Sequence, residues 1–226
     1  ICEGLVGSEM CIRDSITGDG MPEIVCNSEG YFIYAEPNWK EPEKKWKIHR
    51  VTAKGKWQRF THGMGVGDIN GDNRKDIMDM NGWWEQPESL ESDSQWKFHP
   101  FKFSPGGGAH MYAYDVDGDG DNDVITSIAA HGYGLCWYEH QKKEGRIHFV
   151  PHTFMNAKPN ENRYGVKFSQ LHAIDLVDMN RDGLMDIVTG KRFWAHGPNG
   201  DAEPNAPAVL YCCLLYTSPS PRDLRK

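Results

Sequence analysis

Three nine-residue windows of the chain carry carboxylate and amide side chains at the same alternating positions. They are DINGDNRKD (68–76), DVDGDGDND (115–123) and DMNRDGLMD (178–186), and positions 1, 3, 5 and 9 of each hold Asp or Asn. Oxygen ligands at alternate positions, together with the backbone carbonyl of position 7, can wrap around a hard cation such as Ca²⁺. The predicted calcium-binding residues are Asp68, Asn70, Asp72, Arg74, Asp76, Asp115, Asp117, Asp119, Asp121, Asp123, Asp178, Asn180, Asp182, Leu184 and Asp186, of which Arg74, Asp121 and Leu184 contribute carbonyls only.

Two other interpretations of these windows are possible. The same residue types suit Asp/Asn-Gly hairpin turns, which need no metal. An EF-hand requires a bidentate Glu at position 12 and a following helix, but position 12 is Asp79, Thr126 or Thr189 and the next residues alternate like a strand. The spacing shared by three windows favours calcium over plain turns. A fourth window (15–23) is degenerate and keeps the candidate ligands Thr17, Asp19 and Glu23.

Histidines recur at a second kind of position. His62, His110 and His172 each precede a predicted strand that leads into an acidic window, and His131 lies in a later connection of the second full repeat. Converging imidazoles can bind a transition metal such as Zn²⁺ or act as general acid and base, whereas a single His is more often structural. We predict these four as catalytic or metal-binding residues. The matching connection of the last repeat supplies the predicted substrate-binding residues Lys191, Arg192, Trp194 and His196.

Short strands must position both sets of residues. Each acidic window follows an apolar strand and is itself followed by an alternating, β-branched one, and no stretch shows sustained helical periodicity. The windows start at 68, 115 and 178, spacings of 47 and 63 that suit one four-stranded unit per repeat. An aromatic third strand and an outer fourth strand complete each unit, with third strands at 31–37, 82–87 and 134–140 and fourth strands at 46–51, 96–101 and 146–152.

This order of strands around the motif D-x-[DN]-x-D-[GN]-x-x-D resembles the FG-GAP/VCBS repeat family, whose calcium-bound blades also occur in integrin-type propellers. The resemblance covers residues 16–211 and departs from the family pattern in the truncated first copy and at Arg181, where Gly is usual. It implies an all-β chain forming a partial β-propeller, with about four four-stranded blades of a ring that usually has seven. The remaining blades would then lie outside this chain, and the histidines would lie on the face opposite the calcium loops.

The two ends of the chain resemble something other than protein sequence. Residues 5–14 (LVGSEMCIRD) and 213–223 (CLLYTSPSPRD) resemble translations of one sequencing-library adapter from opposite strands. We therefore expect 1–15 and 212–226 to be adapter-derived and to form no strand of their own, which leaves 16–211 as a propeller fragment. Of the cysteines inside that part, Cys26 and Cys136 lie in apolar runs and are predicted to be small buried residues.

Composition and charge argue against nucleic acid as a partner and against a membrane span. The net charge of −7 comes largely from the aspartate clusters, and no basic stripe suggests nucleic acid. No apolar run approaches the length of a membrane span. Calcium-stabilised propellers of this type imply a secreted, periplasmic or cell-surface location, although a signal peptide would lie outside the fragment.

Two functions are compatible with these residues. The first is an extracellular calcium-binding module that binds a protein or a glycan. The second is a metal-assisted sugar lyase or dehydratase, because the histidine-rich face is weakly similar to the propeller of aldos-2-ulose dehydratase-type enzymes. In that hypothesis His62, His110 and His172 hold the metal, and His131 or His196 abstracts a proton. We favour the binding module here, and a cluster of histidines would favour the enzyme.

Overall fold

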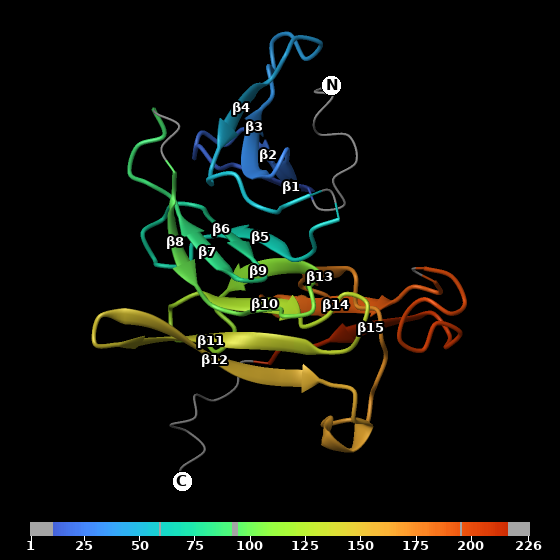
Figure 1. Cartoon of the computed structure of the whole chain (residues 1–226). Coiled ribbons are helices and arrows are strands. Elements are labelled where there is room, and N and C mark those ends of the chain that lie inside the picture. The colour runs from blue at the N-terminus through green and yellow to red at the C-terminus, as the bar shows by residue number, and fades with distance from the viewer. Residues whose placement is uncertain (1–10, 59, 92–94, 195, 217–226) are drawn as a thin grey trace.

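The chain folds almost entirely into β-strands (Figure 1). The computed structural model describes residues 11–58, 60–91, 95–194 and 196–216. Within these ranges the one helical element is the short 3-10 helix η1 (Pro159–Glu161). The prediction of an all-β chain is confirmed. No helix in the described part of the chain has the length and apolar character needed to cross a bilayer.

The strands form successive antiparallel meanders in chain order. The first meander is β1 (Cys11–Asp14), β2 (Glu23–Ser28), β3 (Tyr31–Glu36) and β4 (Lys47–Arg50). The second is β5 (Met64–Gly67), β6 (Asp76–Asp79), β7 (Gly82–Glu85) and β8 (Lys97–Pro100). The third is β9 (His110–Tyr114), β10 (Asp123–Ser127), β11 (Leu135–Lys143) and β12 (Arg146–Met155), and the last is β13 (Ile174–Val177), β14 (Asp186–Lys191) and β15 (Val209–Cys213).

The first strands of the meanders lie next to one another. β5 and β9 pair in parallel and so join the second and third meanders into one curled, eight-stranded mixed sheet. β1 contacts β5, and β13 contacts β9. The chain therefore runs from meander to meander with its first strands β1, β5, β9 and β13 as neighbours, and the later strands extend outward from them (Figure 1).

Tight turns fix the register of two hairpins. Glu29 and Gly30 join β2 to β3 with φ values of 52° and 87°, and Glu144 and Gly145 join β11 to β12 with 53° and 72°. Two central residues with positive φ are the mark of a type I′ turn, whose twist matches that of paired strands. Ser28 accordingly faces Tyr31 across the first of these hairpins.

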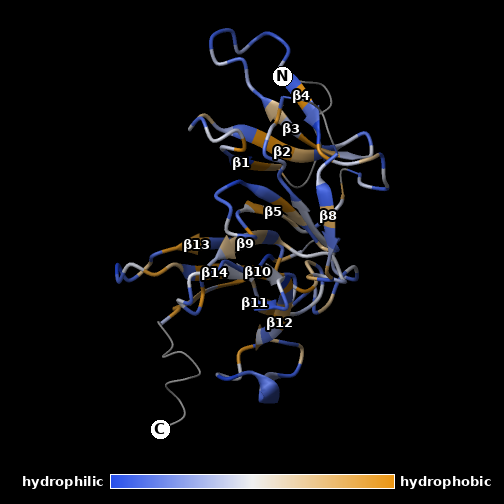
Figure 2. Cartoon of the chain, turned by 90° about the vertical axis from the view of Figure 1, so that its left-hand side faces the viewer, coloured by the Kyte–Doolittle hydropathy of each residue, from blue (hydrophilic) through white to orange (hydrophobic). Residues whose placement is uncertain are grey.

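The core consists of layers between consecutive meanders. Side chains alternate along a strand, so neighbouring residues face opposite sides of the sheet. Ile77 and Trp84 join a cluster with residues of the first meander, whereas Met78 and Trp83 join a cluster with residues of the third. A further cluster packs the third meander on the last. Hydrophobic residues gather on inner strands such as β2, whereas β8 and most connections are hydrophilic (Figure 2). Cys26 and Cys136 are fully buried as predicted.

One aromatic–imidazole–carboxylate contact recurs on the outer strands. In each of three meanders a histidine of the fourth strand stacks on an aromatic ring of the third strand, with ring centres 4.1–4.4 Å apart. A glutamate oxygen lies 2.6–2.7 Å from the Nε2 of the same histidine. The sets are Tyr34–His49–Glu36, Trp83–His99–Glu85 and Trp137–His152–Glu139. The long β11–β12 hairpin brings His152 opposite Trp137.

The expectation that the chain ends form no strand is wrong for the described residues. Cys11–Asp14 pairs along its length with β2 as β1, and Cys212 and Cys213 pair with β14. The backbone hydrogen bonds of a ladder need no particular side chain, and the side chains of β1 are exposed or half-buried. Residues 1–10 and 217–226 of the expected adapter segments lie outside the described residues.

Candidate metal centres

The acidic windows and the histidines lie at opposite ends of the first strands. The windows 68–76, 115–123 and 178–186 begin directly after β5, β9 and β13, and position 9 of each is the first residue of the next strand. His62 and His172 precede β5 and β13 by two residues. Because neighbouring β5 and β9 run parallel, their starts share one edge and their ends the other.

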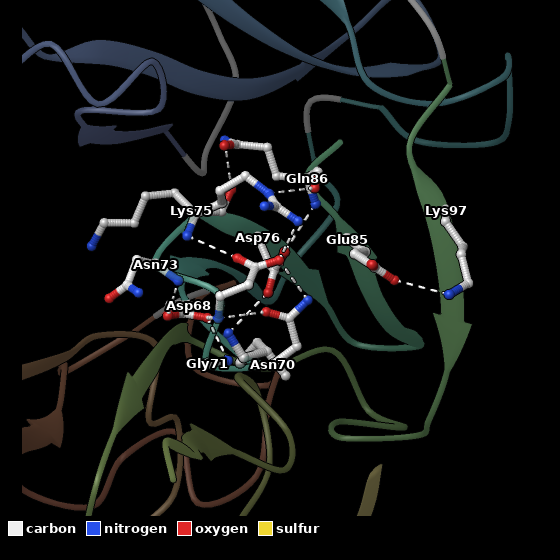
Figure 3. A network of polar contacts seen from close by, with 12 residues as sticks. Asp68, Asn70, Gly71, Asn73, Lys75, Asp76, Glu85, Gln86 and Lys97 are labelled. Atoms are coloured by element: carbon white, nitrogen blue, oxygen red, sulfur yellow. Dashed lines mark hydrogen bonds and ion pairs between the residues drawn. The ribbon is translucent and has the colours of Figure 1, made fainter. Parts of the chain in front are cut away.

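Position 9 of each window connects the loop to the rest of its meander. One oxygen of Asp76 accepts the backbone N–H of Ile69 at 2.9 Å, and the other accepts that of Gln86 at 2.9 Å (Figure 3). Asp123 binds Val116 and His140 in the same way, and Asp186 binds Met179 and Leu215. These carboxylates are fully buried, so the repeated aspartate has a structural role whether or not an ion is bound.

Positions 1 and 5 shape the turn. Asp115 accepts hydrogen bonds from the backbone N–H groups of Gly118, Asp119 and Gly120, and Asp119 accepts one from Asp121. The residue at position 6 has a left-handed backbone in each full window, with φ of 64° to 94° at Asn73, Gly120 and Gly183. Such conformations favour Asn and Gly, the residue types found at position 6 of these windows.

The window 115–123 brings carboxylates closest together. Oxygens of Asp115, Asp117 and Asp123 all lie within 4.8 Å of one another, so these three could hold a metal ion. Asp119 lies outside this close set, and the side chain of Asp121 turns away to Lys142, whose Nζ is 2.6 Å from its Oδ1. The orientation of Asp121 fits a residue that offers only its carbonyl to a cation.

Burial makes the carboxylates of Asp76 and Asp123 hard to ionise without a cation. It raises the pKa of both Asp76 and Asp123 to about 7, although backbone N–H groups act in the opposite direction. The carboxylates at positions 1, 3 or 5 of the same window add to the increase. A bound cation would offset the repulsion among these groups.

The windows 68–76 and 15–23 differ from 115–123 in ways that bear on a cation. In 68–76 the Arg74 guanidinium lies 2.5 Å from Asp72, so one candidate ligand already has a cationic partner. In the degenerate window Glu23 accepts the N–H groups of Ile16 and Thr17, and Ser15 accepts that of Gly20. The loop shape is therefore kept in 15–23 with Ser15 at position 1, whereas Asp19 only caps Met21.

Three histidines from three segments converge at the other end of the strands. The Nε2 of His62 lies 2.9 Å from the Nε2 of His172 and 3.1 Å from the Nε2 of His131. Ring centres in this cluster are 4.8–5.3 Å apart. The three residues form a group that could hold a metal ion, and we call it the histidine cluster.

The proton positions in the histidine cluster favour a shared cation. The Nδ1 of His62 lies 2.5 Å from the backbone carbonyl of Phe60, an acceptor, so this nitrogen carries the hydrogen. The Nε2 of His62 then has one lone pair, yet it faces two other nitrogens. Burial, Arg192 and the neighbouring histidines lower the pKa of His172 to about 4, and burial lowers that of His131. Neutral imidazoles at neutral pH are the form that binds metals.

Asp201 links the histidine cluster to a further histidine. Its side chain is only 6% exposed, and its Oδ1 lies 3.4 Å from the Nδ1 of His131 and 3.0 Å from that of His196. The rings of His131 and His196 are 4.6 Å apart. Sequence reasoning missed Asp201, because an acidic residue in a polar loop carries no signal of its own. The only hint is its position five residues after His196.

His110 does not belong to the histidine cluster. In the pairing of β9 with β10, Tyr114 faces Asp123, just as Gly67 faces Asp76 in the second meander. His110 therefore corresponds to Gly63 rather than His62, and a shift by one residue turns a side chain to the other face of a strand. His131 takes the place that the sequence analysis gave to His110 in the metal-binding set.

The predicted substrate-binding residues of 190–207 have different environments. Lys191 is 3% exposed, and its Nζ donates to the carbonyls of Arg192, Phe193 and Pro204 at 2.9–3.3 Å. It therefore holds the loop together and is not available to a ligand. Arg192 is exposed and close enough to lower the pKa of His172. Trp194 is 46% exposed, and its Nε1 donates to Asn205 at 3.3 Å.

No protein-family model matches the chain, and no curated protein matches it significantly. The chemistry of the two centres is therefore inferred from their residues and geometry.

Proposed function

We propose that the chain is part of a calcium-stabilised β-propeller whose histidine cluster holds a transition metal such as Zn²⁺, and that it serves a lyase or dehydratase acting on a sugar-like compound. Successive meanders with neighbouring first strands support the propeller. The close oxygens of Asp115, Asp117 and Asp123 support a Ca²⁺ site in window 115–123.

The observation that carries the enzyme proposal is the convergence of three imidazole Nε2 atoms. Zn²⁺ binds nitrogen at about 2.0–2.1 Å, and catalytic zinc sites combine three protein ligands with one open position. His62 is oriented by a backbone carbonyl and His131 faces a carboxylate, the outer contacts that metal-binding histidines usually make. Such a pattern favours a metal centre over three structural histidines.

A bound divalent ion would polarise a carbonyl oxygen of the ligand and make the adjacent C–H group more acidic. His196 is hydrogen-bonded to Asp201, its ring lies 4.6 Å from that of His131, and it is the candidate to take that proton. The C–H electrons form the new C=C bond, the C–O bond to the neighbouring hydroxyl breaks, and His196 returns the proton to the departing oxygen as water. No oxidant or reductant is needed for this elimination.

Metal content distinguishes this proposal from a calcium-binding module that binds a protein or glycan. Purified protein is exposed to calcium and zinc, freed of excess metal, and analysed by mass spectrometry of its metals. We expect one zinc per chain in the wild type and none in His172→Ala. The matched control is His110→Ala, which alters a histidine of the adjacent strand and should keep the zinc. If the wild type takes up calcium but no zinc, the binding module is the better function.

A further inference from the structure

A cavity of about 460 Å³ opens beside the histidine cluster. Its walls come from four parts of the chain: residues 56–57 and 60–62, the end of β6 with the turn to β7 (79–81), and the connections around 106–107 and around 131. His62 and His131 line one end. The volume lies within the range of about 300–1,000 Å³ that is typical of small-molecule pockets.

One wall of the cavity is a rigid aromatic surface. Trp57 packs on Phe32 and Trp84 with ring centres 5.2 and 5.6 Å away, and its Nε1 lies 3.3 Å from the buried carboxylate of Asp79. Phe60 lines the same cavity and is 47% exposed. Fixed ring faces of this kind can cover the C–H side of a ligand without losing conformational entropy on binding.

Polar groups line the rest of the cavity. Asn81 and Lys56 are exposed at its surface, and Thr61 is half-buried beside His62. Asp79 is 1% exposed and accepts the backbone N–H of Asn81 at 2.7 Å, so the turn that presents the Asn81 amide is fixed. Amide, hydroxyl and ammonium groups next to aromatic rings suit a compound that carries several hydroxyls.

We propose that this cavity is the substrate site of the metal centre and takes a polyhydroxylated carbonyl or carboxylate compound of monosaccharide size. The inference rests on the proposed function, since the oxygen of the compound would face His62 and His131. The hydroxyls would face Asn81 and Lys56, and the carbon skeleton Phe60 and Trp57. His131 lines the cavity, and its ring lies 4.6 Å from that of His196, the candidate base, which connects the cavity to that residue.

This assignment differs from the one drawn from the sequence, which placed substrate binding in 190–207. Lys191 of that segment is buried and held by three carbonyls. Trp194 is exposed and does not line the cavity. The two locations can therefore be tested against each other with single variants.

The test is calorimetric titration of the zinc-loaded protein with D-gluconate, and with hexanoate as a carboxylate of equal length without hydroxyls. Asn81→Ala and Phe60→Ala remove the side chains of exposed cavity residues but keep the backbone groups that bind Asp79 and His62. We expect each to weaken gluconate binding about tenfold, the effect of losing one hydrogen bond or apolar contact. Trp194→Ala should leave it unchanged, and hexanoate should bind more weakly than gluconate.

Zinc titration of the same samples separates this inference from the proposed function. Intact zinc binding with weakened gluconate binding in both cavity variants supports the cavity. Three outcomes would overturn the cavity assignment. They are equal affinities for gluconate and hexanoate, a loss of gluconate binding only in Trp194→Ala, and the absence of saturable gluconate binding. If the wild type takes up no zinc, the proposed function fails. In that case the cavity would still be supported if the metal-free wild type binds gluconate and both cavity variants abolish this binding.

Discussion

The Nε2 atoms of His62 and His172 lie 2.9 Å apart although 110 positions separate the two residues in the chain. Each precedes a first strand by two residues, and those strands, β5 and β13, lie on either side of β9. The fold therefore brings together residues from meanders that are not consecutive. A metal site built in this way depends on the packing of three meanders, so its ligands and its stability are coupled.

Asp201→Asn is expected to weaken zinc binding about 10- to 100-fold, the usual effect of removing an outer partner of a metal-binding histidine. The carboxylate faces His131 and hydrogen-bonds His196, and an amide in its place would no longer supply negative charge to either imidazole. Zinc affinity is measured by competition with a chelator. Glu203→Gln is the control, since that carboxylate of the same loop pairs with Lys167. Equal losses in both variants would contradict a specific role for Asp201.

Lys191→Met should destabilise the protein, whereas Arg192→Met should not. Removing the buried ammonium leaves three carbonyls without their donor, which costs about 1–3 kcal/mol. In a protein of this size each kcal/mol lowers Tm by about 2–4 °C. Arg192 is exposed, and such substitutions usually change stability by less than about 0.5 kcal/mol. Thermal unfolding by circular dichroism measures both, and similar melting temperatures would refute the structural role of Lys191.

The acidic windows illustrate what the sequence could predict. Oxygen ligands at fixed spacing define a local turn, and the geometry of a local turn depends on neighbouring residues alone. Asp76, Asp123 and Asp186 accordingly occupy equivalent places at the start of their strands. The third and fourth strands were predicted near their observed positions for the same reason, because alternation and aromatic content are local signals.

The histidine cluster shows where prediction from sequence stops. Counting residues back from the aspartates grouped His110 with His62 and His172, but His110 lies five residues before its aspartate instead of six, and this difference turns its side chain to the other face. Lys191 is predicted from the sequence to bind substrate, but it is buried. Its burial depends on how a long connection folds back, which neighbouring residues do not reveal. The cavity could not be predicted, since its walls are distant in the chain and meet only through packing.

Asp117→Asn and Asp121→Asn form a matched pair within one acidic window. The asparagine at 117 can still accept the Asp119 N–H but loses a charge from the close carboxylate set, so calcium affinity should fall about tenfold. Asp121→Asn removes only a side chain directed to Lys142 and keeps the carbonyl, so affinity should hardly change.

Calorimetry of calcium binding measures this difference, and thermal unfolding gives an independent check. Calcium at 100 times its Kd should stabilise the wild type by about 2.7 kcal/mol through mass action. Identical calcium affinities for the two variants, or no shift of Tm with calcium, would show that the window is only a turn.

The glutamates of the stacked histidine contacts should give the protein an acid-sensitive contribution to stability. Burial tends to raise the pKa of Glu85, but hydrogen bonds from His99 and Lys97 outweigh it and leave the pKa lowered; Glu139 is lowered in the same way by Gln141 and His152. A lowered pKa in the folded state means that the ionised form stabilises the fold. That contribution is complete above the ordinary value of 4.5 and is lost as pH falls through the lowered pKa.

Glu85→Gln should therefore unfold about 2–4 °C below the wild type at pH 7, the shift produced by about 1 kcal/mol. Glutamine cannot titrate, so the gap should shrink as the pH is lowered below 4.5. Melting curves between pH 7 and pH 3 measure the gap directly. Glu88→Gln serves as control, because Glu88 lies just outside the strand and takes no part in a stacked set. A gap that stays constant over the whole pH range would mean that Glu85 acts through packing and not through its charge.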